Sequence, residues 1–158
     1  MGKQEKSAVI VGKLDKMVAR LVLHVKKRHW AELEMECDRA LVSFGDEPRL
    51  LFLKAIAAYY IIRLGEAARL AEAAHAGLPH SQEVVGFLSV VYALGGDLNT
   101  SAYYAKLGNT CQPEPRLDGA IPEGFPKFET VFLDIQDRRL FALASRELGA
   151  GQWRQAEV

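Results

Sequence analysis

Residues 82–113 read QEVVGFLSVVYALGGDLNTSAYYAKLGNTCQP, and this stretch decides the fold. Its first part is strongly apolar and stops at Gly95, and its second part is shorter and leads to Pro113. Glycine favours the end of a helix, and proline cannot continue one. The stretch therefore predicts two helices, over about 82–94 and 98–107, joined by a tight turn.

The same residue types recur at an offset of 34 residues along much of the chain. Three columns align in this way, and two prolines close successive units: Trp30, Leu64 and Leu98; Cys37, Ala71 and Ala105; Ala40, Ala74 and Gly108; Pro79 and Pro113. A bulky residue followed by small residues and a closing proline at this period is typical of a solenoid of helix–turn–helix repeats. Such a fold offers a curved surface and no built-in reaction centre, so the pattern favours protein binding over catalysis.

Apolar residues at helical spacing predict further helices before this stretch. These helices are expected at 13–29, 30–44, 48–64 and 65–77. After residue 112 the sequence becomes rich in proline and glycine, which indicates an irregular segment. The chain is accordingly divided into a helical repeat domain at 1–112, a Pro/Gly-rich linker at 113–126 and a C-terminal helical extension at 127–158.

The extension is predicted to begin with an amphipathic helix, because Phe128, Val131, Phe132 and Ile135 share one helical face. This helix can fold back into a groove of the solenoid or continue the solenoid against the helix at 98–107. We favour continuation, since consecutive elements usually pack as neighbours.

A partial fourth unit is predicted at 137–158 from Leu140, Leu143, Ala144, Gly151, Trp153 and Ala156. It breaks off before its second helix, so we expect the chain to be a segment of a longer repeat protein. The alternative is that the last helix is a polar-faced cap of the solenoid.

These columns resemble the tetratricopeptide repeat (TPR). The unit that starts at Gln82 matches best, through Val85, Leu88, Ser89, Tyr92, Gly96, Leu98, Ser101, Ala105 and Pro113. The unit from Pro48 keeps most of the small residues, and the unit from Leu14 is the most divergent. The resemblance covers about 14–113. It implies an all-α, right-handed superhelical solenoid of antiparallel helix pairs that binds another protein.

In a TPR stack the first helix of each unit lines the concave face, and the resemblance implies a protein-binding groove there. Its expected residues are Val18, Val22, Val25, Lys26, Arg49, Phe52, Ile56, Tyr59, Tyr60, Glu83, Val90 and Leu94. TPR proteins that clamp acidic C-terminal tails carry Lys, Arg and Asn at several of these positions, whereas this chain is mainly apolar there. We therefore expect an apolar helix or an extended apolar segment as the partner. The alternative is that Val22, Phe52, Ile56, Tyr59 and Val90 are simply core residues.

Composition and charge argue against nucleic-acid and membrane partners. Lys and Arg number 20, as do Asp and Glu, so the chain has no global field that attracts nucleic acid or an anionic membrane. The basic run HVKKRHW at 24–30 is a loose cue for nucleic acid. We favour the interpretation that its cations complement a helix dipole and face Glu32 and Glu36. The longest apolar run, 55–62, is too short to span a bilayer, and a soluble, cytoplasmic protein is expected.

No catalytic or metal site is predicted. His24, His29, His75 and His80 lack metal-type spacing, and the sequence holds no nucleophile elbow or phosphate-binding glycine loop. We expect a protein without cofactor or enzymatic activity that serves as a scaffold or adaptor subunit of a larger assembly. The alternatives are a small chaperone resembling the TPR chaperones of type III secretion, which hold hydrophobic cargo, a docking arm of a larger enzyme, and a homo-oligomer formed through a solenoid end.

Overall fold

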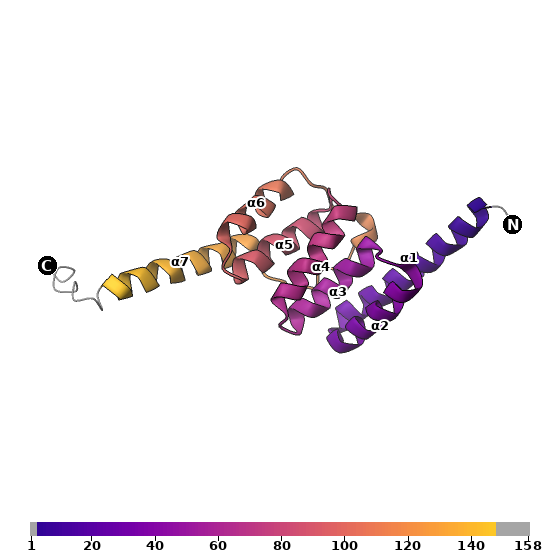
Figure 1. Cartoon of the computed structure of the whole chain (residues 1–158), viewed down its shortest axis with the longest axis horizontal. Coiled ribbons are helices and arrows are strands. Elements are labelled where there is room, and N and C mark those ends of the chain that lie inside the picture. The colour runs from indigo at the N-terminus through magenta and orange to yellow at the C-terminus, as the bar shows by residue number, and fades with distance from the viewer. Residues whose placement is uncertain (1–2, 148–158) are drawn as a thin grey trace.

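The computed structural model describes residues 3–147, with side chains for 8–145, and within this range the protein is all-α (Figure 1). The helices are α1 (Lys3–Lys27), α2 (Trp30–Phe44), α3 (Pro48–Tyr60), α4 (Leu64–Gly77), α5 (Gln82–Leu94), α6 (Leu98–Gly108), the short 3₁₀ helix η1 (Pro115–Leu117) and α7 (Phe128–Glu147). No strand occurs in residues 3–147, where an isolated bridge pairs Ser81 with Gln112. The predicted all-α class is confirmed.

The helix starts of the best-matching unit follow from local capping. At the start of α5, Ser81 Oγ accepts a hydrogen bond from Val84 N at 3.4 Å. At the start of α6, the Asp97 carboxylate accepts one from Thr100 N at 3.1 Å. These side chains satisfy backbone N–H groups that have no partner within the helix.

Two helix boundaries differ from the sequence prediction. Helix α1 begins at Lys3 instead of near residue 13, because the preceding residues include good helix formers and no proline. Helix α3 ends at Tyr60 instead of near residue 64, because Ile62 takes a left-handed conformation with φ 67°. A left-handed residue cannot continue a right-handed helix.

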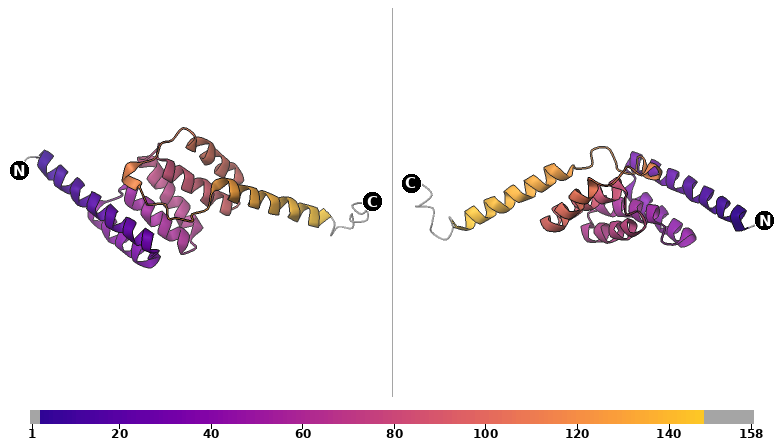
Figure 2. Two further views of the ribbon diagram at one scale, coloured as in Figure 1. Left: turned by 180° about the vertical axis from the view of Figure 1, so that it is seen from behind. Right: turned by 90° about the horizontal axis from the view of Figure 1, so that it is seen from above.

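Each helix from α1 to α6 packs on the next one along the chain (Figures 1 and 2). Four small residues of the repeated columns, in the first two units, are at most 2% exposed: Cys37, Ala40, Ala71 and Ala74. In the third unit Ala105 and Gly108 are half-buried. Since small side chains let helix axes approach closely, the columns seen in the sequence correspond to packing positions.

Residues 113–126, which we call the crossing segment, are irregular apart from η1 but are not a free linker. Leu117 and Ala120 are completely buried in the same core cluster as the apolar residues of α1 to α5. Within that cluster Phe52 and Phe87 pack edge to face, with ring centroids 5.5 Å apart. The segment after the helix pairs is therefore part of the core.

Helix α7 packs chiefly on α5 and has a smaller contact with α6. Its Val131 is buried against Val90 and Ala93 of α5, and Phe128 and Ile135 pack beside them. The expectation that this helix continues the solenoid against the helix at 98–107 is thus wrong in its main contact, because the buried apolar residues that meet α7 belong to α5.

The first part of α1 and the last part of α7 project from opposite ends of the molecule (Figures 1 and 2). Large apolar side chains on these projecting parts are 47–75% exposed: Val9, Ile10 and Val11 on α1, and Leu140, Phe141 and Leu143 on α7. The remaining markers of the predicted fourth unit, Gly151, Trp153 and Ala156, lie outside the described residues.

Candidate protein-binding groove

The crossing segment lies against residues of α1, α3 and α5, three helices that were predicted to line a single groove. Phe125 packs between Phe87 and Tyr59, with its ring centroid 5.2 Å from that of Tyr59. Gly119 lies so close to α1 that an added Cβ would fall 3.2 Å from Val22 Cγ1 and from Lys26 Cε. With φ at 79°, this position also favours glycine for conformational reasons. The crossing segment therefore occupies space in which we expected a partner to bind.

Polar contacts attach the crossing segment near both of its ends. Near its start, Glu114 N donates a hydrogen bond to the Glu83 carboxylate, at 3.0 Å from Oε2. Near its end, Arg28 Nη2 donates to Glu123 O at 2.8 Å. Glu83, an expected groove residue, thus binds the backbone of its own chain.

Most of the expected groove residues are buried to a large extent. Seven have exposed fractions of 7% or less: Val18, Val22, Val25, Arg49, Phe52, Ile56 and Val90. Four are half-buried, namely Tyr59, Tyr60, Glu83 and Leu94, and Lys26 is exposed. Phe52 and Ile56 have no exposed surface for another molecule, which agrees with the alternative that these residues are core.

Tyr59 and Tyr60 are engaged in aromatic contacts within the chain. The ring of Tyr60 stacks on Trp30, with centroids 4.1 Å apart and planes 4° from parallel, and it meets Tyr59 edge to face. Burial raises the pKa of both phenols. Their rings therefore contribute to internal packing between α2, α3 and the crossing segment.

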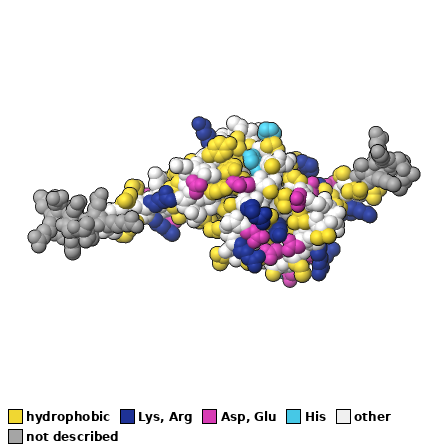
Figure 3. All heavy atoms as spheres, in the orientation of Figure 1, with side chains coloured by type: hydrophobic (Ala, Val, Ile, Leu, Met, Phe, Trp, Pro, Cys, Tyr) yellow, Lys and Arg dark blue, Asp and Glu magenta, His cyan; other side chains and the backbone are white. Residues whose placement is uncertain are grey.

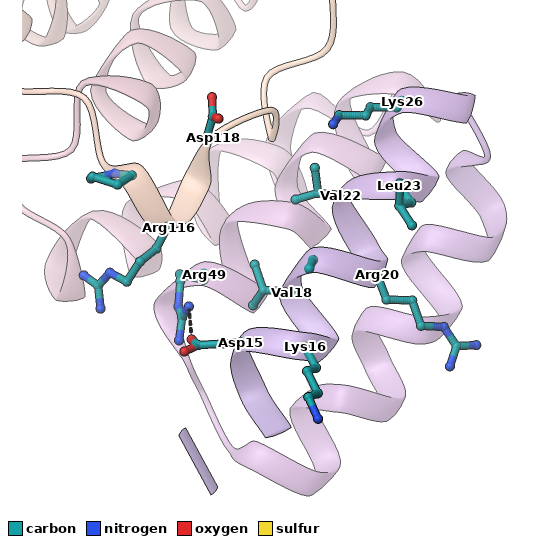
Figure 4. Close-up of a pocket in the computed structure, with 12 residues that line it drawn as sticks. Asp15, Lys16, Val18, Arg20, Val22, Leu23, Lys26, Arg49, Arg116 and Asp118 are labelled. Carbon is teal, nitrogen blue, oxygen red and sulfur yellow. Dashed lines mark hydrogen bonds and ion pairs between the residues drawn. The ribbon is translucent and has the colours of Figure 1, made fainter. Parts of the chain in front are cut away.

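An open groove remains between α1 and η1 (Figure 4). We call it the α1 groove; it has a volume of about 670 Å³. Apolar and cationic side chains line it: Val18, Val22 and Leu23 are apolar, Lys16, Arg20 and Lys26 lie along α1, and Arg49, Pro115, Arg116 and Asp118 form the facing wall. Val18, Val22 and Lys26 lie on the side of α1 that faces this wall, whereas Arg20 and Leu23 lie on the other side of the helix (Figure 4).

Ion pairs neutralise the arginines of the facing wall. The Arg49 side chain is 5% exposed, and its Nη1 lies 2.8 Å from Asp15 Oδ1 while its Nε lies 2.9 Å from Glu47 Oε1. Arg116 Nε lies 2.6 Å from Glu114 Oε1, and this hydrogen bond lowers the pKa of the Glu114 carboxyl. Arg49 thus joins α1 to the start of α3, and Arg116 is paired within the crossing segment.

Positive charge remains available on the α1 side of the groove. Among the side chains that the structure describes, neither Lys16 nor Lys26 forms an ion pair. Arg20 is 65% exposed and lies 3.0 Å from Glu36. Leu23, in the same stretch of helix, is 52% exposed. This part of α1 therefore presents cationic side chains beside an exposed leucine.

The sequence predicted Val18, Val22, Lys26 and Arg49 as groove residues, but not Lys16, Arg20, Leu23 or Arg116, which also line the α1 groove. The repeat register selects fixed positions of each unit and passes over Lys16, Arg20 and Leu23. Their spacing of four and three residues places them on one helical face, and this signal was present in the sequence. Arg116 had no such signal, because it follows no helical period.

Comparisons with known proteins do not assign a function. The chain matches no family model, no curated protein and no solved structure. Among the described residues, no helix combines the length and apolar character needed to cross a membrane. The geometry of the α1 groove is therefore the basis for a functional proposal.

Proposed function

We propose that this chain is a protein-interaction module, a scaffold or adaptor subunit that binds an amphipathic helix or an extended apolar segment in the α1 groove. The observation that carries the proposal is the lining of the α1 groove, where Leu23 is 52% exposed near the buried Val18 and Val22 and next to lysines that form no ion pair within the described side chains. The mechanism is capture of a partner segment without bond chemistry.

A TPR-like solenoid is the architecture we propose for α1 to α6. Two observations support it: each helix packs on the next one along the chain, and small residues at the 34-residue offset are buried in the first two units. In such a solenoid α1, α3 and α5 are the first helices of their pairs and line the concave face. The crossing segment then covers that face near α3, near α5 and at Gly119 beside α1, and the α1 groove between α1 and η1 is the part left for a partner.

The chemistry of the groove indicates which kind of segment fits. An apolar side chain that the partner buries completely in the groove contributes about 1.5–3 kcal/mol before ordering costs. On this chain Leu23 gains burial, whereas Val18 and Val22 are already buried. Lys16 and Lys26 add charge complementarity for Asp or Glu at the edge of the partner's apolar face. We therefore propose an acidic amphipathic segment, which combines both features.

A pull-down with three baits tests this proposal: the wild-type chain, Leu23→Glu and Val42→Glu. Leu23 is 52% exposed in the α1 groove, whereas Val42 is 89% exposed on α2 outside the groove, so both substitutions should leave the fold intact. A partner that binds wild type and Val42→Glu but not Leu23→Glu supports the α1 groove. A partner retained equally by all three baits contradicts it.

The salt dependence of partner binding separates the contribution of charged residues from that of apolar residues. Binding of the captured partner to wild type should weaken as ionic strength rises, because exposed charge pairs are screened over about 10 Å at 0.1 M salt. The double variant Lys16→Gln, Lys26→Gln should bind more weakly at low salt and lose most of this dependence. An unchanged salt dependence in the double variant would show that these lysines do not meet the partner.

Self-association is a second candidate function, favoured by the projecting helix ends. Leu140, Phe141 and Leu143 are 60%, 75% and 56% exposed on the last part of α7. A second copy that covers them removes apolar surface from water. Sedimentation over a range of concentrations tests this: a strictly monomeric chain excludes it, and a dimer that Phe141→Glu dissociates supports it.

A further inference from the structure

Two histidines and a glutamate meet at the turn between α1 and α2. His24 lies in the last turn of α1, His29 precedes α2, and Glu32 lies in the first turn of α2. One donor atom from each of these side chains lies within 4.8 Å of the other two. Two of the three donor atoms are already close to each other, since His29 Nδ1 lies 3.2 Å from Glu32 Oε2.

The backbone of the turn brings the two histidines together. Arg28 takes a left-handed conformation with φ 59°, which ends α1 and reverses the chain. The backbone N–H of His29 then donates to the carbonyl of His24 at 3.0 Å, and the two ring centroids are 5.9 Å apart. The histidines are five residues apart in sequence. This spacing does not place two side chains on one face of a helix or a strand, so the sequence pattern did not predict that they meet.

A further carboxylate lies beside His24. Glu36 Oε2 is 3.1 Å from His24 Nε2 but makes no hydrogen bond with it, and Arg20 donates a hydrogen bond to the other carboxylate oxygen at 3.0 Å. The other ring nitrogen of His24, Nδ1, is buried and has no hydrogen-bond partner among the described residues. Metal-binding histidines commonly have one nitrogen held by a carboxylate, which fixes the tautomer and the orientation of the ring.

We propose that His24, His29 and Glu32 bind one divalent transition-metal ion, and that Glu36 positions His24 by accepting a hydrogen bond from its Nε2 when the ion is bound. Two imidazoles and one carboxylate form a ligand set that suits borderline ions such as Zn²⁺. Bonds of about 2.1 Å in a tetrahedral arrangement require donor atoms roughly 3.4 Å apart. His29 and Glu32 are 48% and 56% exposed, so their side chains have room to close the remaining distance. The bound ion would join the end of α1 to the start of α2.

Zinc titration of the chelator-treated full chain, followed by isothermal titration calorimetry, tests the site. We expect one Zn²⁺ per chain for wild type. His29→Ala and Glu32→Gln should each weaken binding at least tenfold, and Glu36→Gln should weaken it about tenfold, as expected when the residue behind a ligand is lost. Circular dichroism of each variant checks that the helices remain, which is expected because the first two side chains are exposed.

His80→Ala is the matched control, because His80 is an exposed histidine outside the cluster. Its zinc affinity should equal that of wild type. Equal losses in His80→Ala and His29→Ala would overturn the proposal, as would the absence of saturable binding to wild type. Cobalt gives a second readout: the ligand-field absorption of a Co²⁺ complex should appear with wild type and with His80→Ala, and should be lost in His29→Ala.

Discussion

Phe125 is stacked on Phe87, with ring centroids 5.5 Å apart and ring planes 19° from parallel. Phe125 belongs to the crossing segment, which is rich in proline and glycine, and Phe87 belongs to α5 and is 1% exposed. Offset aromatic pairs of this kind stabilise a fold beyond the area that they bury. The contact joins the segment that follows the helix pairs to the core that the helix pairs build.

Phe125→Ala should therefore destabilise the protein by about 2–3 kcal/mol, somewhat less than for a fully buried phenylalanine, because Phe125 is only partly buried. Urea unfolding followed by circular dichroism measures the loss. Phe141→Ala is the control, since Phe141 is 75% exposed on α7 and its loss should change stability by less than about 0.5 kcal/mol. Equal unfolding midpoints for both variants would mean that the crossing segment is not part of the core.

Glutamate substitutions distinguish the buried face from the α1 groove. Ile56 is completely buried, so Ile56→Glu places a carboxylate in the core without a partner and should unfold the protein or cost several kcal/mol. Leu23→Glu should keep wild-type helicity and stability to within about 0.5 kcal/mol, because Leu23 is half exposed. Thermal unfolding by circular dichroism compares the two. A stable Ile56→Glu variant would restore the expectation that this residue faces a partner.

The helices could be predicted from the sequence because their signals are local. Ser81 caps α5 by accepting a hydrogen bond from the backbone N–H of Val84, three residues further along the chain. Ala71 and Ala74 indicate a contact between helices by their small size alone. The path of the crossing segment could not be predicted in this way. Leu117 and Phe125 follow no helical or strand period, and their burial depends on the space that α1, α3 and α5 leave.

In the candidate site, too, features within one helix could be predicted from the sequence, whereas contacts between distant segments could not. Val18 and Val22 follow from the repeat register, and Leu23 follows from helical spacing once α1 is known to expose that side. The position of the open groove depends on where the crossing segment meets α1, near Gly119, and on where η1 places Arg116. These are contacts between distant parts of the chain, which a pattern within one helix does not contain.

Arg49 was expected in a partner groove, and its contacts instead predict a contribution to stability. Arg49→Met should cost about 1–2 kcal/mol, because it removes ion pairs to Asp15 and Glu47 while both carboxylates remain partly exposed to water. Arg39→Met, at an exposed position on α2, should stay within about 0.5 kcal/mol of wild type in urea unfolding.

A double-mutant cycle isolates the pair between α1 and α3. The variants Asp15→Asn, Arg49→Met and their combination should give a coupling energy of about 1 kcal/mol, since the guanidinium is almost completely buried and the carboxylate is half exposed. Additive losses would show that Arg49 stabilises the protein by packing and not through Asp15.

The buried thiol of Cys37 should make the protein less stable at alkaline pH than at neutral pH. Burial, with a smaller contribution from Asp38, raises the pKa of the Cys37 thiol from 9.0 to about 12 in the folded protein. Above pH 9 the unfolded chain releases this proton while the folded chain keeps it, so the unfolded state binds fewer protons and the free energy of unfolding falls with pH up to about 12. The raised pKa of tyrosines such as Tyr59 acts in the same direction. Wild type is therefore expected to unfold more easily at alkaline than at neutral pH.

Cys37→Ala separates the thiol from the tyrosines, which are the same in both proteins. From pH 7.5 to 10.5, wild type should lose about 2 kcal/mol more than the variant, because each pH unit above the unfolded pKa contributes about 1.4 kcal/mol. Urea unfolding at the two pH values gives this difference, and the cost of the smaller side chain cancels because it applies at both. Parallel losses in the two proteins would mean that the thiol ionises as readily in the fold as in the unfolded chain, and that solvent reaches the contact between α2 and α3.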